Sequence, residues 1–131
     1  MTPHVYPKSN AGLSSGDFCF VPRADGRWAL FVYLYPQAKS LSYFFGALAK
    51  KVIAASSLDL IPAQIALDAQ ALLHIKCFEE NDTPIAGNIF DRIDTALFNA
   101  LRSEAHSHGV GSISRVWGYR TIVKRANALA A

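Results

Sequence analysis

The sequence predicts an α+β fold in which one or two helices cover a bent antiparallel sheet or a partly open β-barrel. Three observations predict it: a hairpin turn at Asp25-Gly26, a following segment that is apolar on both faces, and helical spacing over residues 92–105. The 131 residues have the length of one ordinary domain, and their 51% apolar content is typical of a globular protein. We therefore expect a single domain over residues 1–131, beginning with an irregular arm over residues 1–16.

The first two strands should form a hairpin. Residues 17–23 alternate between two faces, and residues 27–35 are rich in the β-branched and aromatic side chains that favour strands. Asp-Gly pairs favour tight hairpin turns, because glycine adopts a positive φ without strain. Pro22 has no N–H to donate, so we expect the first strand to lie at an edge or to bulge near this residue.

The second strand predicts that both sides of the sheet are covered. A strand with one exposed face alternates apolar and polar side chains, whereas residues 28–35 are apolar on both faces. Simple alternation places Tyr33 and Tyr35 on one face, and their hydroxyl groups favour a rim or a partner interface where they find hydrogen-bond partners. The aromatic side chains expected in the core are Phe18, Phe20, Trp28 and Phe31.

The remaining elements follow in order. Residues 43–46 suggest a third strand, but residues 40–56 as a whole are compatible with strand or helix. Residues 70–80 alternate as a strand does, and Ile85–Ile89 suggests another short strand. A helix is expected over residues 92–105, with Asp94 near its start. Residues 112–131 are also compatible with either state, and a strand followed by a short helix is the preferred interpretation.

No complete catalytic signature is present. Motifs such as GxSxG, GxxxxGK[ST], GxGxxG, HExxH and CxxC are all missing from the sequence. His106 and His108 follow Glu104 closely, but further zinc ligands at a recognised spacing are missing, so we predict no metal site, no cofactor and no catalytic residue. An enzyme that uses the His106–His108 segment is the third hypothesis. Cys19 and Cys77 lie in apolar segments and are expected to be buried thiols.

The sequence also indicates where the protein works. Its longest uninterrupted apolar run, Trp28 to Tyr35, is far shorter than the roughly 20 residues of a membrane span. The first 16 residues lack the apolar core of a signal peptide. We therefore expect a cytoplasmic protein with no membrane partner.

Acidic residues gather in the middle of the chain. The net charge is +3, yet residues 52–104 hold eight acidic and three basic side chains. If Ile85–Ile89 ends a strand, the flanking carboxylates should cluster at one end of the sheet beside Asn88. Such a cluster attracts a basic groove of a partner. The residues predicted to bind a partner are therefore Glu79, Glu80, Asp82, Asn88, Asp91 and Asp94, together with Tyr33 and Tyr35.

Nucleic-acid binding is the less favoured alternative. Residues 114–125 interleave aromatic and basic side chains, as single-strand binders do. On a strand, however, Trp117 and Tyr119 face away from Arg120 and Lys124, so rings and charges do not share a surface.

One stretch resembles a known family. Gly16-Asp17, the apolar strand to Pro22, the turn at Asp25-Gly26 and Arg27-Trp28 resemble the opening of immunity protein family 26 of bacterial polymorphic-toxin systems. Residues 72–89 look like a later strand of that family and a short apolar element around a glycine. The resemblance implies a protein that binds a cognate toxin and neutralises it by occluding its active site or an essential surface, without catalysis or cofactor. The alternative is a small β-barrel module that binds nucleic acid or a peptide.

Overall fold

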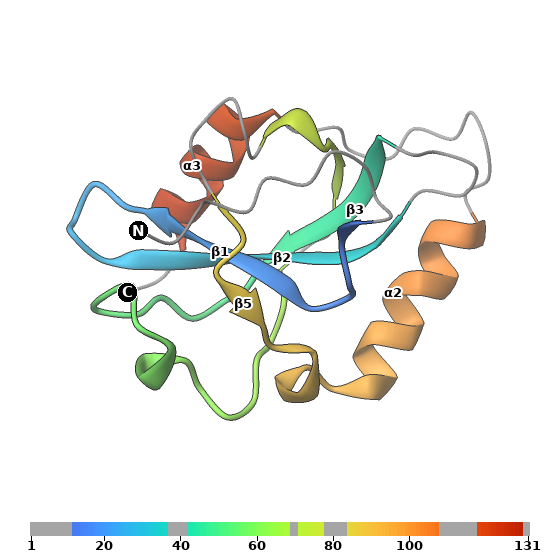
Figure 1. Cartoon of the computed structure of the whole chain (residues 1–131), viewed down its shortest axis with the longest axis horizontal. Helices are drawn as coiled ribbons and strands as arrows, with labels where there is room; N and C mark the ends of the chain where they lie inside the picture. The colour runs from blue at the N-terminus through green and yellow to red at the C-terminus, as the bar shows by residue number, and fades with distance from the viewer. Residues whose placement is uncertain (1–11, 37–41, 69–70, 78–83, 108–117, 130–131) are drawn as a thin grey trace.

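A five-stranded antiparallel sheet with the order β4-β3-β2-β1-β5 organises the chain (Figure 1). The computed structural model describes residues 12–36, 42–68, 71–77, 84–107 and 118–129. Its outer strands, β4 and β5, do not pair with each other within these residues, so the sheet is open. The strands are β1 (Asp17–Pro22), β2 (Trp28–Pro36), β3 (Tyr43–Leu48), β4 (Ala71–His74) and β5 (Gly87–Asn88). The helical elements are α2 (Thr95–Ser107), α3 (Tyr119–Ala128) and the 3-10 turns η2 (Leu58–Leu60) and η3 (Phe90–Arg92).

The predicted α+β fold and its hairpin are confirmed. β1 and β2 pair antiparallel from Phe18 opposite Val32 to Pro22 opposite Trp28. Gly26 adopts a φ of 83°, the conformation that the Asp-Gly turn predicted. Pro22 is the last residue of β1, where its missing N–H disturbs the ladder least.

Two apolar clusters lie on opposite faces of the sheet, as the two apolar faces of β2 predicted. The α2-side cluster takes its cover from residues 49–67 and from Phe98 of α2. The α3-side cluster takes its cover from Ile122 and Ala126 of α3. Figure 1 shows the two helices well apart, with the strands between them. Strand members of the α2-side cluster include Phe18, Leu30, Val32, Leu34, Tyr35 and Phe45, and those of the α3-side cluster include Cys19, Val21, Ala29, Phe31, Tyr33 and Phe44.

A β-bulge changes the faces of β2 near its end. Tyr33 pairs with Gly46, and Tyr35 pairs with Phe45, so two steps along β2 match one step along β3. Leu34 is the extra residue, and it packs with Tyr35 in the α2-side cluster while Tyr33 packs in the α3-side cluster. The prediction that Tyr33 and Tyr35 share a face is therefore wrong.

The segments left open by the sequence are resolved in part. β3 ends at Leu48, and residues 49–57 form no helix; Ala49 and Ile53 instead make single bridges to Leu67 and Trp28. β4 is shorter than the predicted strand over residues 70–80, because the backbone turns after His74 and the Lys76 N–H donates to His74 Nδ1 at 3.1 Å.

The predicted helix near Asp94 is confirmed and begins at Thr95. The Leu97 N–H donates to Asp94 Oδ2 at 3.3 Å, as at a capped helix start. Residues 119–128 form α3, so the short helix expected near the end of the chain is present. It begins at Tyr119, however, so a strand that continues to Arg125 is wrong. Trp117 and the arm residues 1–11 lie outside the described residues.

Arg23 fastens α3 to the hairpin. Its Nη1 donates to the Ala126 carbonyl at 2.6 Å and to the Leu129 carbonyl at 2.9 Å, and its Nη2 pairs with Asp25 at 2.8 Å. The last carbonyls of a helix have no partner within the helix and carry partial negative charge, so a guanidinium satisfies both needs.

The same arginine acts on the titration of Asp25. The hydrogen bond from Arg23 lowers the pKa of Asp25 to about 2, and the Arg27 N–H adds to the effect. An aspartate in the unfolded chain has a pKa of about 3.9. The contribution of the Arg23–Asp25 pair to stability is therefore present at neutral pH and is lost as the pH falls from about 4 to about 2.

Arg23→Met should loosen α3 while leaving the sheet intact. Hydrogen bonds from a charged donor are stronger than neutral ones, so we expect amide exchange in residues 119–128 to accelerate about tenfold or more. Hydrogen exchange followed by mass spectrometry measures this for α3 and the strands together. Arg27→Met removes a neighbouring charge whose side chain makes no hydrogen bond to α3 in the described part of the chain, and it should leave α3 unchanged. Equal exchange in both variants would contradict the anchoring role.

Candidate functional site

A tight corner joins the start of β1 to η3. Gly16 has a φ of 93°, and a Cβ at this position would lie 2.5 Å from the backbone nitrogen of Phe90. The Gly16 N–H donates to the Tyr33 carbonyl at 2.9 Å, and the Ile89 N–H donates to the Gly16 carbonyl at 2.9 Å. The glycine thus allows η3 to lie directly against the end of β1.

Asn88 completes this corner with both ends of its side-chain amide. Its Nδ2 donates to Asp17 Oδ1 at 2.9 Å and to the Ser15 carbonyl at 3.0 Å. Its Oδ1 accepts from the Phe90 N–H at 3.0 Å. Asn88 therefore positions η3, and a direct contact between Asn88 and a partner stays a prediction.

A second segment, residues 61–66, lies beside η3. The Arg92 guanidinium donates to the Ile61 carbonyl at 2.9 Å, and the Ile65 N–H donates to the Arg92 carbonyl at 2.8 Å. Ile65 and Ile93 form a parallel bridge. These contacts bring η2, which ends one residue before Ile61, close to η3.

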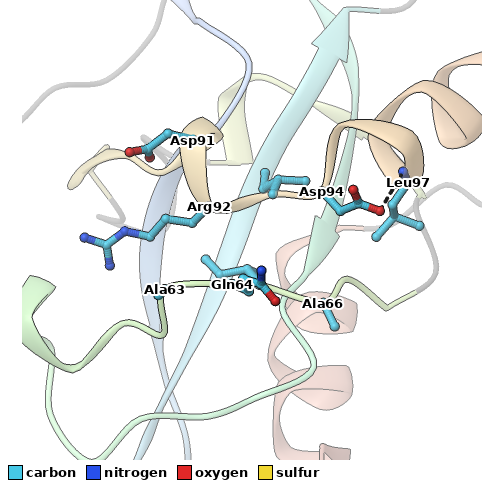
Figure 2. Close-up of a pocket in the computed structure, with 9 residues that line it drawn as sticks. Ala63, Gln64, Ala66, Asp91, Arg92, Asp94 and Leu97 are labelled. Atoms are coloured by element: carbon cyan, nitrogen blue, oxygen red, sulfur yellow. Dashed lines mark hydrogen bonds between the residues drawn. The ribbon is translucent and has the colours of Figure 1, made fainter.

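A cavity of about 620 Å³ opens between these segments and the start of α2 (Figure 2). This volume is within the range of about 300–1,000 Å³ found for ligand sites. In Figure 2 the Arg92 side chain extends away from Asp94, and Gln64 lies across the cavity from Asp94. The cavity is lined by Ala63, Gln64, Ile65, Ala66, Asp91, Arg92, Ile93, Asp94 and Leu97.

The aspartates near this cavity differ from the others in the described part of the chain. Three aspartates elsewhere bind side chains of the chain itself: Asp17 binds Asn88, Asp25 binds Arg23, and Asp68 binds Arg125. Asp59, Asp91 and Asp94 are exposed and form no ion pair with any described residue. Three carboxylates with no cation among the described residues thus lie on η2, on η3 and just before α2. Glu79, Glu80 and Asp82, predicted to join them, lie outside the described residues.

Exposed apolar side chains occupy the same two turns. Leu58 and Leu60 of η2 are 51% and 46% exposed, and Phe90 of η3 is 39% exposed. Leu58 also lies close to β5, because its Cδ2 is 3.7 Å from the position that a Cβ would take at Gly87. We use the name η2–η3 surface for the cavity and the exposed residues beside it. These residues are Leu58, Asp59, Leu60, Phe90, Asp91 and Asp94. Sequence reasoning missed Leu58 and Leu60, since apolar residues are ordinarily expected inside.

Tyr33 and Tyr35 do not belong to this surface. They are only 2% and 3% exposed, and the prediction that they lie at a rim is wrong. Tyr33 packs on Phe44 with ring centroids 5.1 Å apart, and Tyr35 packs on Phe98 at 5.7 Å. Burial raises the pKa of Tyr33 to about 12, with the nearby charge of Asp17 adding to the effect. Both rings are core residues because β2 is covered on each face.

Within the described ranges, no three His, Cys, Asp or Glu side chains gather closely enough to hold a metal ion. His106 lies in the last turn of α2, one residue beyond the helix predicted over residues 92–105, and His108 lies outside the described residues. Cys19 and Cys77 are buried free thiols, as predicted, and burial raises the pKa of Cys19.

The sequence matches no protein-family model. No curated protein matches it significantly either. No solved structure gives a significant match. No helix in the described ranges is long and apolar enough to cross a membrane. Membership of immunity protein family 26 therefore stays a prediction.

Proposed function

We propose that the chain is an immunity protein of the bacterial cytoplasm, which binds a cognate toxin and covers the toxin's active site or an essential surface. The observation that carries the proposal is the η2–η3 surface. There Asp59, Asp91 and Asp94 have no cation among the described residues, and exposed apolar side chains lie on the same two turns, η2 and η3. Apolar residues with a charged rim are the usual composition of a protein-binding surface.

The arrangement of η3 also supports a binding role. Hydrogen bonds from Ile89 to Gly16, from Phe90 to Asn88 and from Ile65 to Arg92 hold this turn in place. A surface that is ordered before binding loses less conformational freedom when the partner arrives. Carboxylates that have no ion-pair partner among the described residues add long-range attraction to a basic partner, which accelerates association at low salt.

The alternative of a nucleic-acid module is less well supported. Base stacking on a sheet needs exposed aromatic side chains, but Phe18, Phe31, Tyr33 and Tyr35 of the hairpin are buried. The segment with interleaved rings and bases is helical from Tyr119. Arg120 and Lys124 are exposed on that helix, but no exposed ring of the hairpin lies beside them to stack on a base.

Charge reversal on the η2–η3 surface should weaken toxin binding. We expect Asp91→Lys with Asp94→Lys to raise the dissociation constant at least tenfold, about 1.4 kcal/mol, without unfolding the chain. The toxin is the product of a neighbouring gene whose expression stops growth unless this chain is expressed with it. Calorimetric titration measures the binding, and circular dichroism checks the fold.

Two further variants make this test specific. Lys124→Glu reverses a charge on α3, across the sheet from η3, and should leave the dissociation constant within about twofold. The triple variant Glu79→Lys, Glu80→Lys and Asp82→Lys tests the other predicted acids and is also expected to weaken binding at least about tenfold. Growth arrest that persists despite expression of this chain with each neighbouring candidate toxin would refute the immunity function itself.

A further inference from the structure

We propose that the cavity of the η2–η3 surface receives an arginine or lysine side chain from a basic, partly apolar segment of the partner protein. The inference rests on the proposed function and goes further, because it assigns the chemistry of the contact. Its starting point is a cavity of about 620 Å³ whose lining includes Asp91 and Asp94, two aspartates with no ion-pair partner among the described residues.

Charge complementarity favours a cation. Arg92, the one basic residue among the described lining residues, donates to the Ile61 carbonyl at 2.9 Å, and in Figure 2 its side chain extends away from Asp94. It therefore leaves Asp94 without an ion-pair partner among the described residues. Among the described residues, the Asp94 carboxylate accepts one hydrogen bond, at 3.3 Å from the Leu97 N–H, so it retains acceptor capacity.

The rest of the lining suits the stem of a long basic side chain. Ile65, Ile93 and Leu97 supply apolar contacts, and the exposed amide of Gln64 supplies a further acceptor across the cavity from Asp94. Arginine and lysine carry an apolar stem with a charged end, so they match walls of this mixed character. A wholly apolar occupant would leave the Asp94 carboxylate without water or a partner.

The surroundings of the cavity favour a protein segment over a small cation. Leu60 precedes Ile61, to which Arg92 is bonded, and Phe90 precedes the lining residue Asp91. Exposed apolar side chains therefore continue outward from the cavity along both turns. A free amine or guanidinium has no group that could cover these exposed apolar side chains. A protein segment can place its own apolar residues against them, beside its basic side chain.

The test uses the full chain and two synthetic peptides in which leucine alternates with arginine or with citrulline. Citrulline keeps the shape of arginine but carries no charge. We expect the arginine peptide to bind at least about tenfold more tightly than the citrulline peptide, and its affinity to fall when sodium chloride rises from about 50 mM to about 500 mM. Nitrogen-15 chemical shifts should change most at Gln64, Ala66 and Leu97.

Matched variants assign the effect to the cavity. Asp91→Asn with Asp94→Asn removes both charges at nearly constant shape and should reduce the affinity for the arginine peptide at least about tenfold. Asp68→Asn removes one carboxylate, from an aspartate that is paired with Arg125, and should change the affinity by less than about twofold. Ala66→Phe, which fills part of the cavity at an exposed position, should reduce binding of the peptide while the fold is retained.

Four results would overturn the inference: equal binding of the two peptides, equal affinity in the double variant and Asp68→Asn, shift changes confined to other faces, or binding of arginine amide as tight as that of the peptide. The last would indicate a small-molecule site. Toxin neutralisation that persists without peptide binding removes this inference alone. Peptide binding at the cavity without neutralisation of any neighbouring toxin removes the proposed function alone.

Discussion

Gly16→Ala should destabilise the fold by about 3 kcal/mol or more, the sum of two separate effects. An alanine at a φ of 93° is strained by about 1–2 kcal/mol. In addition, its Cβ would lie 2.5 Å from the nitrogen and 2.6 Å from the Cα of Phe90, which are backbone atoms that cannot rotate away. The end of β1 and η3 must therefore separate, and the hydrogen bond from Ile89 to Gly16 must lengthen.

Gly26→Ala is the matched control. Gly26 has a similar φ of 83°, but a Cβ there would meet no atom within 4 Å. We expect this variant to lose only the conformational part, about 1–2 kcal/mol. Urea denaturation of both variants measures the difference, which isolates the close approach of η3 to β1. Equal losses at the two glycines would show that η3 moves aside freely.

Phe31→Ala should cost about 3–5 kcal/mol, as other large-to-small changes at buried aromatic positions do. The ring is 1% exposed and packs edge-on against Phe44 with centroids 6.2 Å apart. It also lies above Gly46, where a Cβ would come within 2.5 Å of the Phe31 Cζ. No neighbouring side chain can fill this space without leaving its own contacts, so a cavity should remain.

Trp28→Ala provides the comparison within the same strand. The sequence predicted that Trp28 lies in the core with Phe31. In the structure Trp28 is half-buried at the end of the hairpin, and the centroid of its ring lies 6.4 Å from that of Phe20. Since less apolar surface is lost there, we expect about 1–2 kcal/mol. Chemical denaturation of both variants checks the order, and a Trp28→Ala loss as large as that of Phe31→Ala would contradict it.

The predictable parts of the fold are those that local chemistry decides. The Asp25-Gly26 turn, the two apolar faces of β2 and the start of α2 at Asp94 follow from turn geometry, burial and capping. The bulge at Leu34 could not be foreseen, because an extra residue in an all-apolar strand leaves no mark in the alternation. That one residue moved Tyr35 to the other face. The irregular cover over residues 49–67 also lacks a periodic signal.

The candidate site was predictable in its charges but not in its apolar part. Asp91 and Asp94 were singled out from the sequence, since acidic residues around a short strand suggested an exposed cluster, and both are exposed. Leu58 and Leu60 were not singled out. Tertiary packing decides whether an apolar side chain on a 3-10 turn is buried or exposed, and the local sequence does not show that packing. Asn88 was singled out for partner contact, whereas its amide is bonded to Asp17 and Phe90.

The corner at Gly16 would also couple binding of the proposed partner to folding. Its backbone joins residues far apart in the chain, since Gly16 bonds both Tyr33 of the hairpin and Ile89 beside η3. The surface around η3 is therefore complete only after the hairpin has formed. By thermodynamic linkage, a ligand that binds only this assembled state stabilises every element on which the state depends. A bound partner would thus protect the β1–β2 hairpin from unfolding, although the buried rings of that hairpin never touch it.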